Sequence, residues 1–506
     1  MKNTILKTTV TFLLLLVMGS CAKWTDIKPK GYNMLQTVSE IDLLFNSTYS
    51  ANVNMSWKSS MFMNNFYSLN FTSLSMYTFI TEPLQQPLMT ACVAWDESID
   101  RASATETDNV YTTYYGMIGK ICNPTILSAD MAVGERAVAN RLKAEAYVLR
   151  AWFHYNLVNY YAKAYNPVTA KEDGGIPYSM ETDLLSVPNQ KYSVQQVYDF
   201  MVADLDAAIS SNSLAPPSQN RMRVNSAFAY AVKAKVLMSM RDYEGAYQAA
   251  AASLAIENTI DDYNDALDIG ASSLRLTRLR LTSREDLFYM DANDFRLAGM
   301  TPELAAIVER GHIFFRHLNN YTSPISYFGI VCDLYGSTSI FLNPCGLSTV
   351  DMYLIQAECL IRKGDATSIN SGVDLLNFIR RHRVAVKEIY EPKTEGYDLT
   401  VKIDPEDYYA PWTASNIAQG IAMIKQMERT ENFHGPKYFF SMKRWNTEEA
   451  WKETLTKHMD CVISDASGII TLVGSYDFTL PPDSPLWIYP FPWRAIIYNK
   501  NLTQNY

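Results

Sequence analysis

The sequence predicts a mainly α-helical protein, built on a series of helical pairs and carrying a loop-rich face. Residues 140–161 form a long helical pattern rich in Ala, Leu, Arg and aromatic residues. Residues 225–256 contain two helical patterns joined by a tight turn, and a similar pair covers 352–383. Two such pairs in one chain indicate repeat units of a helical solenoid rather than isolated hairpins.

The other helices are placed by capping residues and by helix breakers. Ser193 is expected to cap a helix that continues to about residue 210. Pro216-Pro217 then separates this helix from the first pair. In chain order, the expected helices cover residues 38–49, 108–127, 140–161, 194–210, 225–240, 243–256, 352–362, 371–383 and 416–432.

The first helical pair has the spacing of a tetratricopeptide repeat. Tyr243, Ala246 and Ala252 lie where such a repeat places its aromatic and small packing residues. Small residues let two helices approach closely, so we expect Ala246 and Ala252 to pack between the two arms. The predicted scaffold is therefore a tetratricopeptide-like helical repeat.

Three stretches lack a helical period. Residues 50–100 are expected to form irregular loop with short regular pieces. Residues 390–412, rich in Pro, Tyr and charge, are expected to be an inserted loop. From Ile469 onward the chain carries several prolines, which predict an extended and irregular tail.

The N-terminus has the pattern of a bacterial lipoprotein signal. Two lysines precede a mostly apolar run at 10–18, and the small residues Gly19-Ser20 stand directly before Cys21. This order is typical of a secretory signal peptide, and the run is too short to span a bilayer. We expect removal of residues 1–20 and lipidation of Cys21. The alternative is an ordinary signal peptide with a chance cysteine.

Charge and cysteine content exclude several classes of partner and site. The net charge is −9 and no long basic run is present, so nucleic acid and anionic membrane surfaces are poor partners. No later segment resembles a transmembrane helix, so an acyl chain would be the only membrane attachment. The other cysteines form no CxxC pair and are expected to be buried free thiols. They are Cys92, Cys122, Cys332, Cys345, Cys359 and Cys461.

Two stretches combine many aromatic residues with very few charges. Residues 46–95 contain two charged side chains, and 318–350 contain one. Flat aromatic rings cover the C–H faces of sugars, and neighbouring amides bind their hydroxyls. The expected ligand-binding residues are Trp57, Tyr67, Tyr77 and Trp95 in the first stretch, with Tyr321 and Tyr327 in the second. For any one of these rings, the alternative is a place in the core or against a protein partner.

Other conspicuous side chains have structural explanations. Aromatic residues of the long helix lie at helical spacing and are expected in the core. Three arginines are expected to tie helices together. The aromatic residues are Trp152, Phe153, Tyr155, Tyr160 and Tyr161, and the arginines are Arg150, Arg380 and Arg444.

The sequence contains no specific catalytic or metal-binding motif. It has no GxSxG elbow, no P-loop and no HExxH. His312 and His317 are five residues apart, which is off the helical spacing for joint metal ligation. The acidic run 261–268 lacks the oxygen pattern and glycine of a helix-loop-helix calcium site. We therefore expect no catalytic residue, no metal and no cofactor.

Taken together, several segments resemble the SusD/RagB family of Bacteroidetes outer-membrane lipoproteins. They occur in the family's order and follow a lipoprotein-like start. The resemblance covers essentially the whole mature chain, although Ser441 and His434 stand where the family commonly has acidic residues. The segments are 140–165 with Gly175-Ile176-Pro177, 353–365, 376–383, 428–445, 489–492 and 501–505.

The resemblance implies a cell-surface protein without enzymatic activity. It would capture an oligosaccharide and cap a SusC-like TonB-dependent barrel in the outer membrane, through which the ligand is imported. Two alternatives stay open: a cap that binds oligopeptides, and a structural cap with little ligand affinity. The expected regions are the signal peptide 1–20, an N-terminal region 21–215, a middle region 216–345 and a C-terminal region 346–506, within one compact body.

Overall fold

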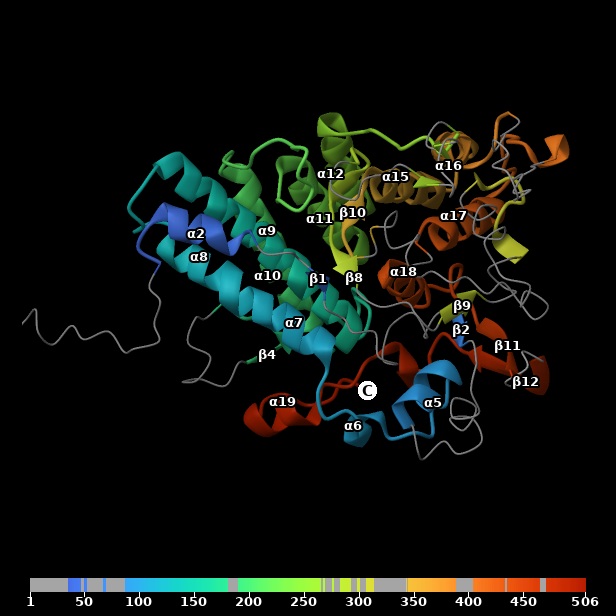
Figure 1. Cartoon of the computed structure of the whole chain (residues 1–506), viewed down its shortest axis with the longest axis horizontal. Coiled ribbons are helices and arrows are strands. Elements are labelled where there is room, and N and C mark those ends of the chain that lie inside the picture. The colour runs from blue at the N-terminus through green and yellow to red at the C-terminus, as the bar shows by residue number, and fades with distance from the viewer. Residues whose placement is uncertain are drawn as a thin grey trace, which may run out of the picture.

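The protein is described here from a computed structural model (Figure 1). The described residues are 35–46, 50–51, 67–69, 87–180, 190–264, 267–268, 275–276, 283–292, 298–300, 306–313, 343, 345–387, 404–432, 435–464 and 470–506. Lipidation of Cys21 lies outside these residues.

Helices form most of the described structure, which confirms the predicted mainly α fold. The α-helices are α2 (Val38–Leu44), α5 (Pro87–Val93), α6 (Arg101–Ala104), α7 (Asn109–Met117), α8 (Asn123–Ser128), α9 (Arg136–Tyr161), α10 (Val194–Ser210), α11 (Ser226–Ser239), α12 (Tyr243–Ile256), α15 (Thr349–Lys363), α16 (Ala366–Arg383), α17 (Ile417–Glu431), α18 (Lys437–Trp445) and α19 (Trp493–Tyr498). A π-helix, η2 (Ile118–Cys122), joins α7 to α8, so the single helix predicted at 108–127 is interrupted.

Six of these helices form one continuous array. Each packs on the one before it in the order α9, α10, α11, α12, α15 and α16, as Figure 1 lets the reader follow. Because α12 packs directly on α15, the two predicted helical pairs are neighbours in one array. This arrangement confirms the repeat scaffold.

Local sequence fixes where the helices of the array begin and end. The side chains of Ser193, Asn225, Asp242 and Asp365 each accept a hydrogen bond from a backbone amide in the first turn of the helix that follows. Such caps satisfy amides that have no partner within the helix. At the other end of α15, Gly364 takes the left-handed conformation with φ of 80°, which glycine adopts without strain.

Small residues let the arms of each pair approach closely, with one difference from the prediction. Ala246 is fully buried, as expected. Ala252 is only half-buried, and Ser253 points into the contact instead, donating a 2.8 Å hydrogen bond from Oγ to Ala227 O. The prediction for Ala252 is therefore wrong, because a displacement of one residue along a helix rotates the side chain by about 100°.

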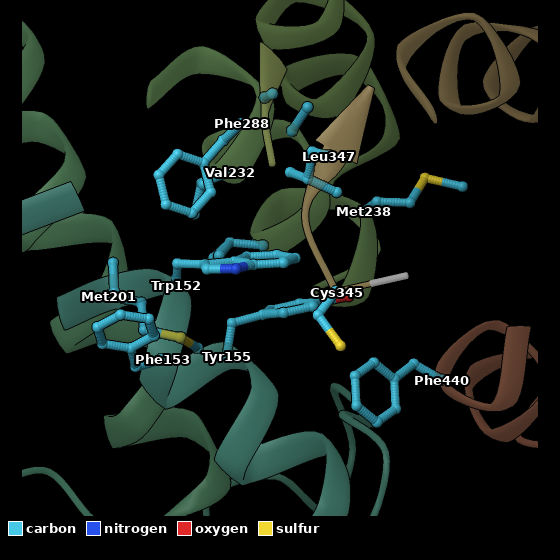
Figure 2. Packing of buried hydrophobic residues seen from close by; sticks show 14 of the residues in the cluster. Trp152, Phe153, Tyr155, Met201, Val232, Met238, Phe288, Cys345, Leu347 and Phe440 are labelled. Atoms are coloured by element: carbon cyan, nitrogen blue, oxygen red, sulfur yellow. The ribbon is translucent and has the colours of Figure 1, made fainter. Parts of the chain in front are cut away.

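The core is centred on α9, whose C-terminal half is buried on all sides. Figure 2 shows Trp152 stacked on Tyr155, with ring centroids 5.4 Å apart. Phe153, Tyr160 and Tyr161 are also buried, so the predicted core aromatics are confirmed.

The three arginines do connect elements, as predicted. Arg150 of α9 donates two hydrogen bonds to Asp204 of α10, at 2.7 and 2.6 Å. Arg444 of α18 makes two 2.7 Å bonds to the carboxylate of Glu358 on α15. Arg380 of α16 binds Glu309 in the same two-pronged way.

Strands occur only as two-stranded pairs in the described residues. Five pairs are β1 (Ser50–Ala51) with β8 (Asp291–Ala292), β2 (Tyr67–Leu69) with β9 (Ala298–Met300), β3 (Gly174–Pro177) with β4 (Lys191–Ser193), β5 (Leu267–Asp268) with β6 (Arg275–Leu276), and β7 (Asp286–Phe288) with β10 (Leu347–Ser348). The sixth is a long antiparallel hairpin of β11 (Leu455–Ser464) and β12 (Ile470–Leu480). The sequence predicted an irregular tail from Ile469 onward. This prediction is wrong for residues 470–480, which form the second strand of the hairpin.

Candidate ligand-binding face

Three distant parts of the chain meet beside the β11–β12 hairpin. Strand β2, from the first aromatic-rich stretch, pairs in antiparallel fashion with β9 from the middle region. β11, from the C-terminal region, contacts β2. Figure 1 shows these strands together at one side of the molecule, with α5 nearby. We refer to the hairpin with β2, β9 and Trp95 as the hairpin face.

Lys457 lies at the centre of this face. Its side chain is buried, and its Nζ lies over the ring of Trp95, 4.2 Å from the centroid. The ring of Phe478 is 5.9 Å from the same Nζ. An ammonium group is attracted to the negative face of an aromatic ring, and more strongly when it is desolvated. Lys457 therefore links α5 and its following turn to the hairpin.

Tyr476 and Phe478 form a paired aromatic surface on β12. They are two residues apart, so they lie on one side of the strand, and their rings stack 6.3 Å apart with an interplanar angle of 10°. Both side chains are half-buried. Glycine at position 474 leaves room for the Tyr476 ring, because a Cβ there would lie 2.8 Å from that ring. A partly exposed pair of nearly parallel rings can stack on a flat or C–H-faced ligand.

The opposite side of the hairpin carries charge. His458 and Asp477 are paired across the two strands, and the Nδ1–Oδ1 distance is 2.7 Å. Both side chains are well exposed. The hairpin thus has an aromatic side and a charged side, as the period of two along a strand dictates.

The chain matches a known family and a set of solved structures. Residues 24–238 match the family model SusD-like, described as starch-binding and associating with the outer membrane. A SusD superfamily protein from Bacteroides fragilis has a TM-score of 0.62 at 15% identity, covering 93% of this chain and 100% of that one. Residues 24–238 are thus similar to the SusD-like family, and the chain as a whole has the fold of SusD superfamily structures.

Two further solved structures have the same fold as this chain. A SusD-like carbohydrate-binding protein from Bacteroides vulgatus has a TM-score of 0.58 at 13% identity, covering 92% of this chain and 97% of that one. Surface glycan-binding protein A from Bacteroides fluxus has a TM-score of 0.55 at 15% identity, with coverages of 92% and 98%. No curated protein matches the sequence.

The structure places two of the six predicted ligand residues. Trp95 is 5% exposed and Lys457 covers its ring, so this ring belongs to the core and is not open for stacking. Tyr67 begins β2, opposite Met300 of β9, and the structure places its backbone on the hairpin face. Trp57, Tyr77, Tyr321 and Tyr327 lie outside the described residues.

The sequence analysis missed Tyr476 and Phe478. The signal that could have found them is the alternation Tyr476–Asp477–Phe478–Thr479, which is typical of a strand with one apolar side. The strand was not predicted, because the prolines that follow this segment indicated an irregular tail. The segments around Tyr67 and Trp95, both from the first aromatic-rich stretch, nevertheless both contact β11.

The other candidate sites have structural roles in the described residues. Asp261 accepts a 2.6 Å hydrogen bond from Ser283 Oγ, and Asp262 accepts from the amide of Asn264. Burial lowers the pKa of His312 to about 3, so its imidazole is neutral. No group of three potential metal ligands is found in this part of the chain. His317 lies outside it.

The predictions for the cysteines and for membrane-spanning helices can also be compared with the structure. Cys92, Cys122, Cys345 and Cys359 are buried free thiols, as predicted. The side chain of Cys461, and Cys332 as a whole, lie outside the described residues. None of the helices described is both long and apolar enough to cross a membrane.

Proposed function

We propose that this protein is a cell-surface lipoprotein that captures an oligosaccharide and caps a SusC-like TonB-dependent barrel for import. The observation that carries the proposal is the family match, because the family is described as starch-binding and associated with the outer membrane. A solved relative in fold is described as a carbohydrate-binding protein and another as a glycan-binding protein. Cys21 would hold the chain at the membrane through its lipid.

The hairpin face supports a binding role for this region. It presents two nearly parallel, half-buried rings, Tyr476 and Phe478, beside the strand that begins at Tyr67. Rings of this kind give large contact area at low entropy cost, and they suit the C–H face of a neutral sugar. We propose Tyr476 and Phe478 as ligand contacts, in addition to Trp57, Tyr67, Tyr77, Tyr321 and Tyr327.

The proposed action is binding and transfer without bond cleavage. The protein would hold the ligand between its loop-rich face and the barrel until the barrel imports it. Specificity would come from ring stacking and from hydrogen bonds to the sugar hydroxyls. No cofactor would take part.

A binding panel tests the ligand class. Calorimetric titration of the wild-type protein with neutral oligosaccharides should give binding, and Tyr476→Ala should weaken it by about 1–3 kcal/mol, the size of one stacked ring on a nucleic-acid base. Tyr498→Ala is the matched control, because Tyr498 is 82% exposed on α19, outside the hairpin face. Binding of oligopeptides but not sugars would favour the peptide-binding alternative.

Purification from native membranes tests the partner and the anchor. Mild detergent should release the protein together with a large TonB-dependent barrel, and the mature N-terminus should carry lipid at Cys21. Recovery as a lone, unlipidated monomer would contradict both parts of the proposal. A stable complex with the barrel and no binding to any soluble ligand would indicate a structural cap.

A further inference from the structure

A small, partly open polar cavity lies between the helical array and helices α17 and α18. Its volume is about 20 Å³, and its walls come from α9, α11, α15, α17 and α18. Figure 2 shows three residues of its wall, Tyr155, Met238 and Phe440, which come from three different helices. The cavity therefore lies where helices α9, α11 and α15 meet the C-terminal helices α17 and α18.

Lys235 of α11 is the unusual group in this wall. Its side chain is 11% exposed. Its Nζ lies 3.7 Å from Asp351 Oδ1, which is beyond hydrogen-bond range. Among the described residues, the ammonium makes no other ion pair and no hydrogen bond. A buried charge without hydrogen bonds is strongly unfavourable, since it loses its hydration without replacement.

The charges that face Lys235 keep it protonated. Burial lowers the pKa of its amine, but the carboxylates of Glu428 and Asp351 outweigh burial and leave the pKa above its ordinary value. Arg444 acts in the opposite direction, more weakly. An ammonium group has three N–H donors and needs acceptors for them.

The direct acceptors around the cavity are already used or out of reach. Asp351 Oδ2 accepts from Lys437 Nζ at 3.0 Å. Glu428 Oε1 accepts from Ser441 Oγ at 2.6 Å, and its other oxygen accepts no hydrogen bond from the residues described. The carboxylate of Glu428 and the ammonium of Lys235 thus face the same small space without touching each other.

We propose that this cavity is a binding site for one ordered water molecule. The water accepts a hydrogen bond from Lys235 Nζ and donates one to the carboxylate of Glu428, so it joins α11 to α17. The volume suffices, because a single water needs about 10–15 Å³. The wall is polar enough, because Ser239 and Tyr155 add hydroxyl groups to the two charges. The water also completes the hydration that Lys235 otherwise lacks.

A crystal structure that resolves ordered solvent tests the site directly. We expect a density peak in the cavity at about 2.7–3.2 Å from Lys235 Nζ. An empty cavity would overturn the proposal. A Lys235 ammonium bonded directly to Glu428 or Asp351, with no water between them, would overturn it equally.

A pair of variants adds a measurement in solution. Lys235→Met has a similar shape but no donor, so it should remove the density peak and lower Tm. Lys233→Met is the control on the same helix, because Lys233 pairs with Asp206 at the surface, and it should leave both unchanged. A Lys235→Met structure that keeps the peak would show that the ammonium does not hold the water. Should this variant fail to fold, the wild-type density alone decides.

Discussion

The helical array and the hairpin face both contain buried charge, but they differ in how far their aromatic rings are exposed. In the array, buried arginines meet carboxylates in two-pronged pairs, as Arg150 does with Asp204 and Arg444 with Glu358. On the hairpin face, the ammonium of Lys457 lies over the aromatic ring of Trp95. Two-pronged pairs fix the geometry of two helices, because both donors must align with both acceptors.

This difference separates a rigid support from a contact surface. The rings of the array, such as Trp152 and Tyr160, are almost completely buried. The rings of β12, Tyr476 and Phe478, are only partly buried where they pack against the core. Substitutions in the array should therefore change stability, and substitutions on the hairpin face should change stability less and binding more.

The largest effect is expected from removing Glu358, at the centre of the array. Its carboxylate accepts hydrogen bonds from Arg444, from Arg362 at 2.8 Å and from the indole of Trp445 at 3.1 Å. Glu358→Ala should lower the free energy of unfolding by about 3–5 kcal/mol, because it leaves the buried guanidinium of Arg444 without its carboxylate partner, although Arg362 keeps Glu448. Urea unfolding measures this. Glu449→Ala, at an exposed pair with Lys452, should change it by less than about 1 kcal/mol.

The same carboxylate predicts a loss of stability in acid. Burial raises the pKa of Glu358, but Arg444 and Arg362 outweigh burial and hold the pKa at about 2, below its ordinary 4.5. Because the folded-state pKa is the lower one, this contribution is complete above about pH 4.5 and is lost as the pH falls towards 2. The contribution of Glu358 to the free energy of unfolding is about 3 kcal/mol, because one pKa unit corresponds to about 1.4 kcal/mol.

Unfolding experiments between neutral pH and about pH 3 check this slope. Glu358→Gln has no carboxylate, so it should be less stable at neutral pH and show a flatter pH dependence than the wild-type protein. Equal slopes for the two proteins would contradict the assignment of the acid sensitivity to this residue.

A third prediction concerns the contact between helices α11 and α12. Ala246 is fully buried in this pair, so Ala246→Leu should overpack the contact and lower the free energy of unfolding by about 1–3 kcal/mol. Ala252 is half-buried, so Ala252→Leu should have a clearly smaller effect. Thermal unfolding of the two variants compares them. Equal losses would mean that both alanines face the partner helix.

Ala246 and Ala252 also show how far the sequence could predict the scaffold. Helical period, the Ser193 cap and the Gly364 turn are local signals, and each places a helix boundary within a few residues. The rotation of a helix about its axis depends on the whole set of its neighbours. That is why the helical pair was predicted correctly while the inward position of Ala252 was not.

The hairpin face was harder to predict for a physical reason. A strand is stabilised by a partner that can be distant in the chain, as β2 is by β9. Composition identified the aromatic-rich stretch that contains Trp95, but not that Lys457, far along the chain, covers its ring. Aromatic content alone does not distinguish a ring in the core from a ring that contacts ligand.

The smallest effect on stability is expected on the hairpin face, from Lys457→Met. Methionine keeps the apolar stem and loses the ammonium over Trp95, so the free energy of unfolding should fall by about 0.5–2 kcal/mol, the range of a cation–π contact. His458→Ala, on the charged side of the hairpin, removes an exposed pair with Asp477 and should cost less than about 1 kcal/mol. Chemical unfolding compares the two variants. If Lys457→Met were as damaging as Glu358→Ala, the hairpin face would be as much a part of the rigid support as the helical array, and the contrast between the two regions would not hold.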